Sequence, residues 1–314
     1  MPNLNTDIEN LLSRTNLTSP FGEFLKKLEE EVPRLGKIRN LQPILEGYED
    51  ANFILESDLG RLVLKIFTKE RSPKNNKDYV RILEESAKIG VPVPKLIFYG
   101  KISSASFIIT EFFEGENFEN GTPMLSDIIA ITAYLSKLNT LNFPVDELYD
   151  SWGNKNLLKE YEKSRNNLTS QQDKLIAPIV EGFKKVDFSK FQKAVIHGDL
   201  QRKHVLKSGK GKYCILDFGC MSNDSKVIEL STFLAWFCLQ EDTWEQREEI
   251  IDKVINNYAS IHQLSSQETA SIPTLIKASY AAYFLRTSIL IKEGDTSEET
   301  KEWHEKSNKL LISM

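Results

Sequence analysis

The segment His197–Asp217 constrains this chain most, because it sets two histidines and two aspartates around a short turn. It reads HGDLQRKHVLKSGKGKYCILD, with apolar runs on either side of Ser208–Gly211. A hairpin brings the ends of its two strands together, so Asp199, His204 and Asp217 are expected to converge on one edge. The alternative is an ordinary hairpin with solvated aspartates and a core histidine.

The residue types in this segment suit phosphoryl transfer. A carboxylate within hydrogen-bond reach of an alcohol can orient it and accept its proton. A second carboxylate can hold a divalent cation against phosphate oxygens. Gly198 and Gly219 permit backbone conformations that larger residues resist. Because phosphoryl transfer depends mainly on positioning and charge neutralisation, we interpret the ordered set H-G-D-x-x-x-x-H, hairpin, L-D-F-G as a catalytic block.

Hydrophobic periodicity predicts a strand-rich N-terminal part followed by a helix-rich remainder. Strands are expected at 51–56, 61–67, 96–99 and 106–110, and the block 194–218 is β-like within the helical part. Helices are expected at 7–14, 21–32, 76–89, 124–141, 156–166, 171–186, 225–239, 243–263, 267–291 and 297–312. This order predicts an α+β chain of two lobes. The expected parts are residues 1–110 with a helical start at 1–34, a hinge at 111–115, and a helical lobe at 116–314.

Charge and targeting signals narrow the partners and the compartment. The 314 residues carry a formal net charge of -5, which argues against a duplex nucleic acid partner. The most apolar stretch, 227–239, is too short to cross a membrane. The start MPNLNTDIEN lacks the pattern of a secretion signal, and the cysteines lack C-x-x-C spacing. We therefore expect a cytoplasmic protein with no nucleic acid and no membrane partner; no sequence signal indicates the oligomeric state.

The series HGDL…HVL…ILDFG resembles the catalytic block of the aminoglycoside phosphotransferase and choline kinase-like family, which has a two-lobed protein-kinase-like fold. The resemblance implies Asp199 as the catalytic base, His197 as the structural histidine of the catalytic loop, and Asp217 as the principal Mg²⁺ ligand. His204 stands where most members carry a metal-binding Asn, although magnesium prefers oxygen ligands. In this it is similar to the 2''-aminoglycoside phosphotransferase branch. Protein kinases carry a lysine two residues after the catalytic aspartate, where this chain has Gln201, and this argues against a protein kinase.

The same resemblance implies a lysine that holds the α- and β-phosphates of ATP or GTP. Lys65, within LVLKIF, lies where that lysine is expected, on an alternating strand among apolar neighbours. It needs a carboxylate partner on the following helix. Asp78 fits the family spacing, and Glu84 and Glu85 are alternatives.

Three further segments correspond to parts of the family pattern. The turn 46–52 stands at the phosphate loop but has a single glycine. Glu111 and Phe113, in IITEFFEG, are expected to bind a purine edge through their backbone. Glu229 either supports the catalytic loop or begins a helix, where acids are favoured.

The acceptor is expected to be a small hydroxylated molecule. Residues 221–314 contain 15 Asp/Glu and 9 Lys/Arg, which suits a cationic acceptor such as an aminoglycoside. The tract 241–245 either faces such an acceptor or is a solvated helix start. Three hypotheses follow: an aminoglycoside-type kinase, a metabolite kinase of the same fold for choline, homoserine or a methylthio-sugar, and a nucleotide-binding pseudokinase.

Overall fold

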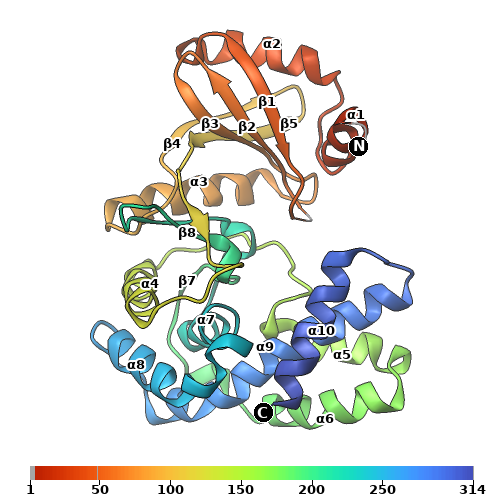
Figure 1. The fold of residues 1–314 in the computed structure, drawn as a ribbon, viewed down its shortest axis with the longest axis vertical. Helices are drawn as coiled ribbons and strands as arrows, with labels where there is room; N and C mark the ends of the chain where they lie inside the picture. The colour runs from red at the N-terminus through yellow and green to blue at the C-terminus, as the bar shows by residue number, and fades with distance from the viewer. Residues whose placement is uncertain (1–3, 48, 314) are drawn as a thin grey trace. The chain divides into compact units, whose positions relative to one another are not determined.

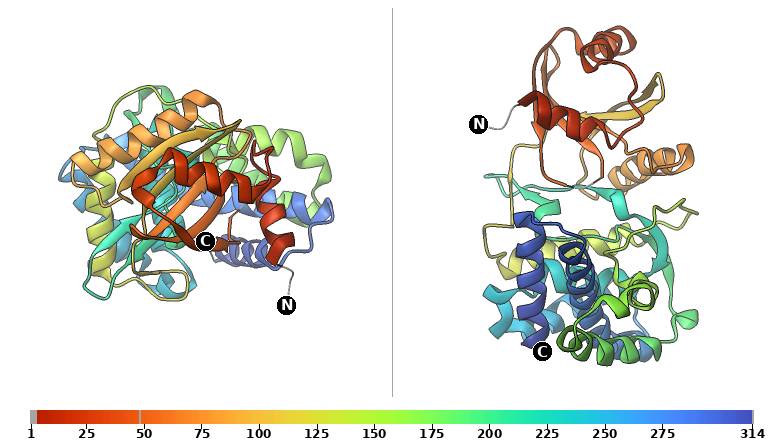
Figure 2. Two further views of the ribbon diagram at one scale, coloured as in Figure 1. Left: turned by 90° about the horizontal axis from the view of Figure 1, so that it is seen from above. Right: turned by 90° about the vertical axis from the view of Figure 1, so that its right-hand side faces the viewer.

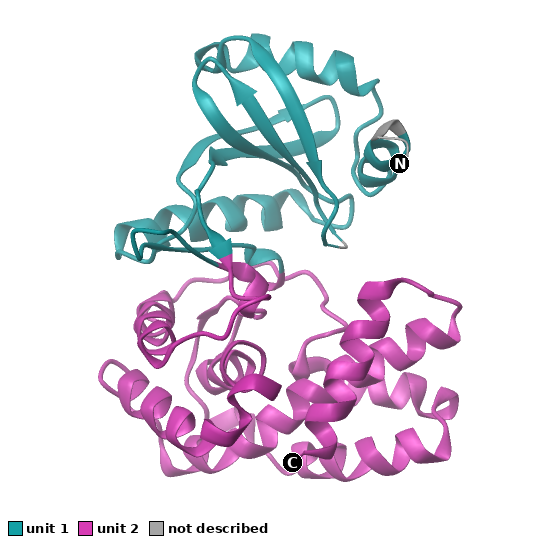
Figure 3. Cartoon of the chain, in the orientation of Figure 1, with its two compact units in different colours: residues 1–116, 206–219 teal, residues 117–205, 220–314 magenta. Residues whose placement is uncertain are grey.

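The structure is a computed structural model that describes residues 4–47 and 49–313. Two compact units are distinguished in Figure 3: unit 1 comprises residues 1–116 and 206–219, and unit 2 comprises residues 117–205 and 220–314. The hairpin that ends at Asp217 thus belongs to unit 1. The sequence boundaries had grouped it with the helical part, because local periodicity does not report which elements pack together.

Unit 1 contains a five-stranded antiparallel sheet (Figure 1), with strand order β1-β2-β3-β5-β4. The predicted strands are present and one further strand, β1, precedes them. The strands are β1 (Ile38–Ile44), β2 (Ala51–Ser57), β3 (Gly60–Ile66), β4 (Leu96–Ile102) and β5 (Ala105–Glu111). The β2–β3 hairpin turns at Asp58-Leu59. The next residue, Gly60, has a φ of 116°, a backbone conformation that favours glycine.

Helices cover both faces of this sheet, as the views in Figure 2 show. Helix α2 (Phe21–Glu31) buries Phe24 and Leu28 in a core that includes Leu64 of β3. Strand alternation puts Lys65 on the other face, where the ring of Tyr79 from α3 (Pro73–Lys88) lies 5.6 Å from its ammonium. Helix α3 begins with Pro73 after a Ser72 cap, earlier than the sequence pattern predicts. Helix α1 (Leu4–Leu12) precedes α2.

The hairpin of unit 1 joins β8 (Val205–Lys207) to β9 (Tyr213–Ile215). The amide of Ser208 donates to the carbonyl of Lys212 at 2.8 Å and closes the predicted turn. Where the chain passes between the units lies the short strand β6 (Glu116–Asn117).

Unit 2 is helical around α9 (Ser266–Lys292), which packs against α5, α6, α7 and α10. A two-stranded antiparallel ladder of β7 (Lys193–Ile196) and β10 (Ser222–Ser225) leads into the region of Asp199. The other helices are α4 (Leu125–Leu138), α5 (Leu157–Ser164), α6 (Ser170–Lys184), α7 (Lys226–Phe233), α8 (Arg247–Ala259) and α10 (Glu298–Ile312). The α+β class with a small antiparallel sheet and a helical remainder is confirmed.

Two expected helices are interrupted. Helix α7 ends at Phe233 and continues as one π-helical turn, Leu234–Cys238, in which the amide of Leu239 donates to the carbonyl of Leu234. Helix α8 starts only at Arg247, after the 3₁₀ segment Glu241–Gln246. Other 3₁₀ segments lie at Pro33–Leu35, Asn154–Asn156, Arg165–Asn167, Phe188–Lys190, Arg202–His204 and Phe218–Cys220. In the described part of the chain, no helix has the length and apolar character needed to span a membrane.

Candidate active site

Lys65 lies between two carboxylates in unit 1. Its Nζ is 3.1 Å from Asp50 Oδ2 and 3.3 Å from Asp217 Oδ1. Burial on its own would lower the pKa of Lys65, but the negative charges of Asp217 and Asp50 outweigh it, so its pKa lies above the ordinary value. Lys65 is therefore a fixed positive charge.

Arg71 ties the loop before β2 to the end of the hairpin. Its guanidinium is fully buried and donates to Asp50 through Nε at 3.2 Å, and to Glu49 through Nη2 at 3.1 Å. Its Nη1 donates to Asn75 Oδ1 at 2.8 Å and to the carbonyl of Gly219 at 3.3 Å. Burial opposes ionisation of Asp50, but the charges of Lys65 and Arg71 hold its pKa below the usual range. Arg71 and Asp50 form the buried centre of this network, and its two outer carboxylates, Asp217 and Glu49, are 43% and 40% exposed.

Asp217 has the exposure and the chemistry of a metal ligand. Its backbone φ is 56°, in the left-handed region that Asp adopts more readily than most residues. The amide of Gly219 donates to its Oδ1 at 3.3 Å, and 43% of its side chain is exposed. Mg²⁺ usually takes one or two protein carboxylates together with phosphate oxygens and water. The residues with described positions include no cluster of three or more His, Cys, Asp or Glu side chains that could hold a metal by itself. Asp217 is a partly exposed carboxylate of the kind that Mg²⁺ shares with phosphate oxygens.

The expected pairing of Lys65 with an acid of the next helix is corrected by the structure. Asp78 pairs with Lys74 at 2.7 Å, while Lys65 takes Asp50, which precedes β2. The spacing argument considered only the helix, and it passed over the acidic loop at 46–52. Tyr48 of that loop lies outside the described residues.

The two residues expected at a purine edge lie at and just beyond the end of β5. The amide of Glu111 donates to the carbonyl of Lys95 at 2.9 Å, and its carboxylate pairs with the Lys95 ammonium. Phe113 lies next to Gly115, where a Cβ would come within 2.9 Å of the carbonyl oxygen of Lys207. Purine binding by Glu111 and Phe113 stays a prediction.

Asp199 is held by two donors in unit 2. The side-chain Nε2 of Gln201 donates to both carboxylate oxygens, Oδ1 at 2.9 Å and Oδ2 at 2.8 Å. The hydroxyl of Tyr283, from α9, donates to Oδ1 at 3.1 Å. These contacts fix the orientation of the Asp199 carboxylate, which remains 19% exposed.

The backbone around Asp199 is fixed by buried partners. His197 is fully buried, and its Nδ1 accepts from the amide of Asp199 at 3.2 Å. Gly198 has a φ of 86°, and a Cβ there would lie 2.3 Å from the carbonyl of Cys220. Its amide donates to Glu229 Oε2 at 3.0 Å. Burial raises the pKa of Glu229. Glu229 thus meets both expectations, since it contacts the backbone of Gly198 and also lies in the first turn of α7.

His204 also contacts Asp199. Its Nδ1 lies 2.7 Å from the carbonyl oxygen of Asp199, which requires a proton on Nδ1. Nε2 would then be the nitrogen with a lone pair for a metal. Because Asp217 belongs to unit 1 and His204 to unit 2, the convergence of these two residues stays a prediction.

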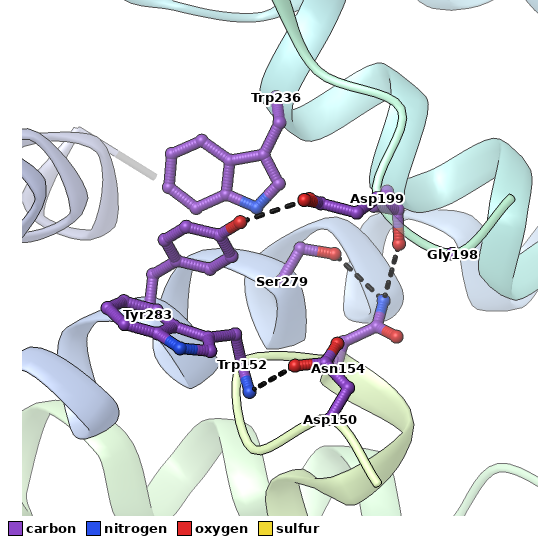
Figure 4. Close-up of a pocket in the computed structure, with 10 residues that line it drawn as sticks. Asp150, Trp152, Asn154, Gly198, Asp199, Trp236, Ser279 and Tyr283 are labelled. Atoms are coloured by element: carbon purple, nitrogen blue, oxygen red, sulfur yellow. Dashed lines mark hydrogen bonds between the residues drawn. The ribbon is translucent and has the colours of Figure 1, made fainter. Parts of the chain in front are cut away.

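A small pocket opens beside Asp199 in unit 2 (Figure 4). Its walls come from the segment before α5, from the loop that carries Gly198 and Asp199, from the end of α7 with the π turn that follows, and from α9. The lining residues are Asp150, Trp152, Gly153, Asn154, Gly198, Asp199, Thr232, Trp236, Ser279 and Tyr283. Trp236 and Tyr283 are core residues, 1% and 8% exposed, and they also line this pocket. No local sequence pattern links them to Asp199, because each lies far from it in sequence.

Comparison with known proteins shows the family and agrees with this fold. The sequence profile of the phosphotransferase enzyme family matches residues 40–264. The chain is 21% identical over 263 residues to a homoserine kinase of Methylobacillus flagellatus, covering 80% of each protein. It is 24% identical over 273 residues to a homoserine kinase of Bartonella tribocorum, covering 80% of this chain and 81% of that one.

Solved structures with the same fold include two small-molecule kinases. A spectinomycin phosphotransferase in complex with ADP and its antibiotic superposes with a TM-score of 0.67 at 13% identity, covering 92% of this chain and 97% of that one. A choline kinase of Streptococcus pneumoniae superposes with a TM-score of 0.65 at 16% identity, covering 93% and 100%. The two-lobed kinase-like fold expected from the sequence is thereby confirmed.

Proposed function

The chain belongs to the phosphotransferase enzyme family, and we propose that it transfers the γ-phosphate of ATP or GTP to a hydroxyl of an aminoglycoside-like or other small acceptor. It is a small-molecule kinase whose acceptor group is an alcohol. The observation that carries this proposal is the Asp199 carboxylate, oriented by Gln201 and Tyr283 at the edge of a pocket. A carboxylate held in this way is suited to an acceptor hydroxyl.

Asp199 is the base of the reaction. The acceptor oxygen forms a bond to the γ-phosphorus while the bond from that phosphorus to the β–γ bridging oxygen breaks. The hydroxyl proton passes to Asp199, and the nucleoside diphosphate leaves with the bridging oxygen. His197 and Glu229 act indirectly, since they hold the backbone that carries Asp199.

Lys65 and Asp217 serve the nucleotide. Lys65 supplies the fixed positive charge for the phosphates, and Asp50 with Arg71 keeps it in place. Asp217 would hold Mg²⁺, which neutralises phosphate charge when bound. His204 remains a proposed second ligand through Nε2.

Two acceptor classes are supported by different observations. The sequence motif and a spectinomycin phosphotransferase of the same fold support an aminoglycoside-like acceptor. The sequence relatives named as homoserine kinases favour a metabolite with a primary hydroxyl. Both are small polar molecules that carry an amine and a hydroxyl group.

The test is Mg²⁺-dependent release of ADP or GDP with a panel of aminoglycosides, homoserine and choline. We expect one acceptor class to stimulate turnover in the wild-type chain. Asp199→Asn should lower kcat by roughly 10²–10⁴-fold, because general-base catalysis contributes about that much. Nucleotide binding, measured by calorimetry, should persist in this variant.

The matched control is Asp252→Asn, which makes the same chemical change at an exposed position of α8. It should leave kcat unchanged. Equal acceptor-stimulated turnover in Asp199→Asn and the wild type would remove Asp199 from the reaction. Nucleotide binding without turnover on any acceptor would instead favour the pseudokinase hypothesis.

A further inference from the structure

The pocket in unit 2 combines a buried carboxylate with aromatic walls. Asp150 is 9% exposed, and its Oδ1 accepts from the amide of Trp152 at 2.8 Å. The rings of Trp152 and Trp236 flank Tyr283, at centroid distances of 5.1 and 4.3 Å. Figure 4 shows these side chains around one space with Asp199 at its edge. Aromatic faces beside a carboxylate are a favourable environment for an organic cation.

The charges around this space favour a cationic ligand. Burial raises the pKa of Asp150 to about 6, and the negative charge of Asp199 adds to this effect. Lys155 acts on Asp150 electrostatically, but its ammonium is paired with Glu147 at 2.7 Å. A ligand ammonium would relieve the repulsion between the two carboxylates.

Trp236 provides a second, independent pointer to a ligand. Its indole Nε1 has no hydrogen-bond partner among the described residues, although the side chain is only 1% exposed. A buried donor without a partner is costly, so such a group marks a place where a ligand or water binds. Figure 4 shows the nitrogen-bearing edge of Trp236 turned toward Tyr283 and Asp199.

Resting on the proposed function, we infer that the acceptor is a small amino alcohol whose ammonium binds at Asp150 and whose hydroxyl binds between Trp236 and Asp199. The hydroxyl oxygen accepts from Trp236 Nε1 and the hydroxyl proton is donated to Asp199. The aromatic faces of Trp152 and Tyr283 cover the carbon chain and the ammonium. Trp236 is in this arrangement a positioning residue for the attacking oxygen.

The size of the pocket limits this acceptor. It encloses about 220 Å³, including space open to solvent. A small acceptor suits a pocket of this size better than an aminoglycoside of several rings does.

The experiment uses matched pairs of alcohols that differ in the cationic group. The pairs are ethanolamine with propanol, homoserine with hydroxybutyrate, and choline with dimethylbutanol. Binding is measured by calorimetry without nucleotide, and turnover by nucleoside diphosphate release with Mg²⁺. We expect at least one cationic member to bind and react, and its neutral partner to do so at least 10-fold less well.

Two substitutions separate the two ends of the ligand. Asp150→Asn should raise KM for the cationic alcohol by about 10–100-fold, because a charge-assisted contact is lost. It should have no comparable effect on the neutral partner. Trp236→Phe keeps the ring and removes the donor, so kcat should fall about 10-fold with less change in the calorimetric Kd. The matched controls are Asp252→Asn and Trp244→Phe, which lie outside the lining of the pocket.

The outcomes distinguish this inference from the function on which it rests. Turnover with equal preference for the neutral alcohols, or KM for the cationic alcohol unchanged in Asp150→Asn, overturns the inference and leaves the kinase function standing. Cationic alcohols that bind in an Asp150-dependent way without turnover support the binding site and contradict the transfer. No binding and no turnover with any cationic alcohol of the panel overturns the inference.

Discussion

At the level of single side chains, the orientation of Asp199 depends on Gln201. The side-chain Nε2 of Gln201 donates to both oxygens of the Asp199 carboxylate at 2.8 and 2.9 Å, and Gln201 is 2% exposed. Gln201→Met keeps the length of the side chain and removes these donors. We expect kcat to fall roughly 10-fold or more, because a hydrogen bond to a charged group contributes about 1.5–3 kcal/mol. The KM values for nucleotide and acceptor should change little.

This split between kcat and KM identifies a positioning role. The control Gln171→Met makes the same replacement at an exposed position of α6 and should leave both constants unchanged. A rise in KM for the acceptor at constant kcat would show instead that Gln201 shapes the pocket.

At the level of secondary-structure elements, Arg71 joins three parts of unit 1. It contacts the loop before β2 through Asp50, the start of α3 through Asn75, and the end of the hairpin through Gly219. Arg71→Met leaves buried carboxylate charge without one of its partners, and breaking a buried pair in this way costs about 3–5 kcal/mol. We expect hydrogen exchange in β2, β3 and the hairpin to accelerate by the factor that corresponds to this loss of stability. We also expect KM for the nucleotide to rise.

Hydrogen exchange with peptide resolution measures this effect directly. The control is Arg39→Met, which removes an exposed pair with Asp58 that is worth about 1 kcal/mol or less. Equal exchange in β3 for both variants would contradict a structural role for the buried network.

Helices and strands were predictable from the sequence where one hydrophobic period runs through the whole element. The strands at β2 and β3 follow from alternation and from the Asp-Leu-Gly turn, and the long helix α9 follows from its apolar spacing. The π turn at Leu234–Cys238 was not predictable, because one extra residue in a fully apolar helix leaves the pattern unchanged. That turn carries Trp236, so the place of this residue in the lining of the pocket was not predictable either.

For the molecule as a whole, the sequence did not predict the contacts between segments that lie far apart in the chain. Motif spacing singled out Asp199, Asp217 and Lys65, because each lies beside a recognisable turn or strand. Asp50 and Asp150 were missed, since their partners are brought in by tertiary packing and leave no local signal.

The pH dependence of stability follows from one of these residues. The pKa of Asp150 is raised from 3.8 to about 6, so the folded chain retains a proton that the unfolded chain loses between pH 4 and pH 6. The free energy of unfolding therefore falls as the pH rises through this window, and the full loss caused by Asp150 is reached above about pH 6. A shift of this size corresponds to about 3 kcal/mol at most.

Asp150→Asn removes this titration and keeps an oxygen that accepts from the amide of Trp152. We expect the variant to be more stable than the wild type at pH 8 and nearly equal at pH 4. All four tryptophans lie in unit 2, so denaturant unfolding followed by tryptophan fluorescence reports on the unit that contains Asp150. Asp252→Asn, at an exposed site, should show no such pH-dependent gain. An equal gain for Asp150→Asn at both pH values would mean that repacking, rather than the buried charge, sets the stability of this pocket.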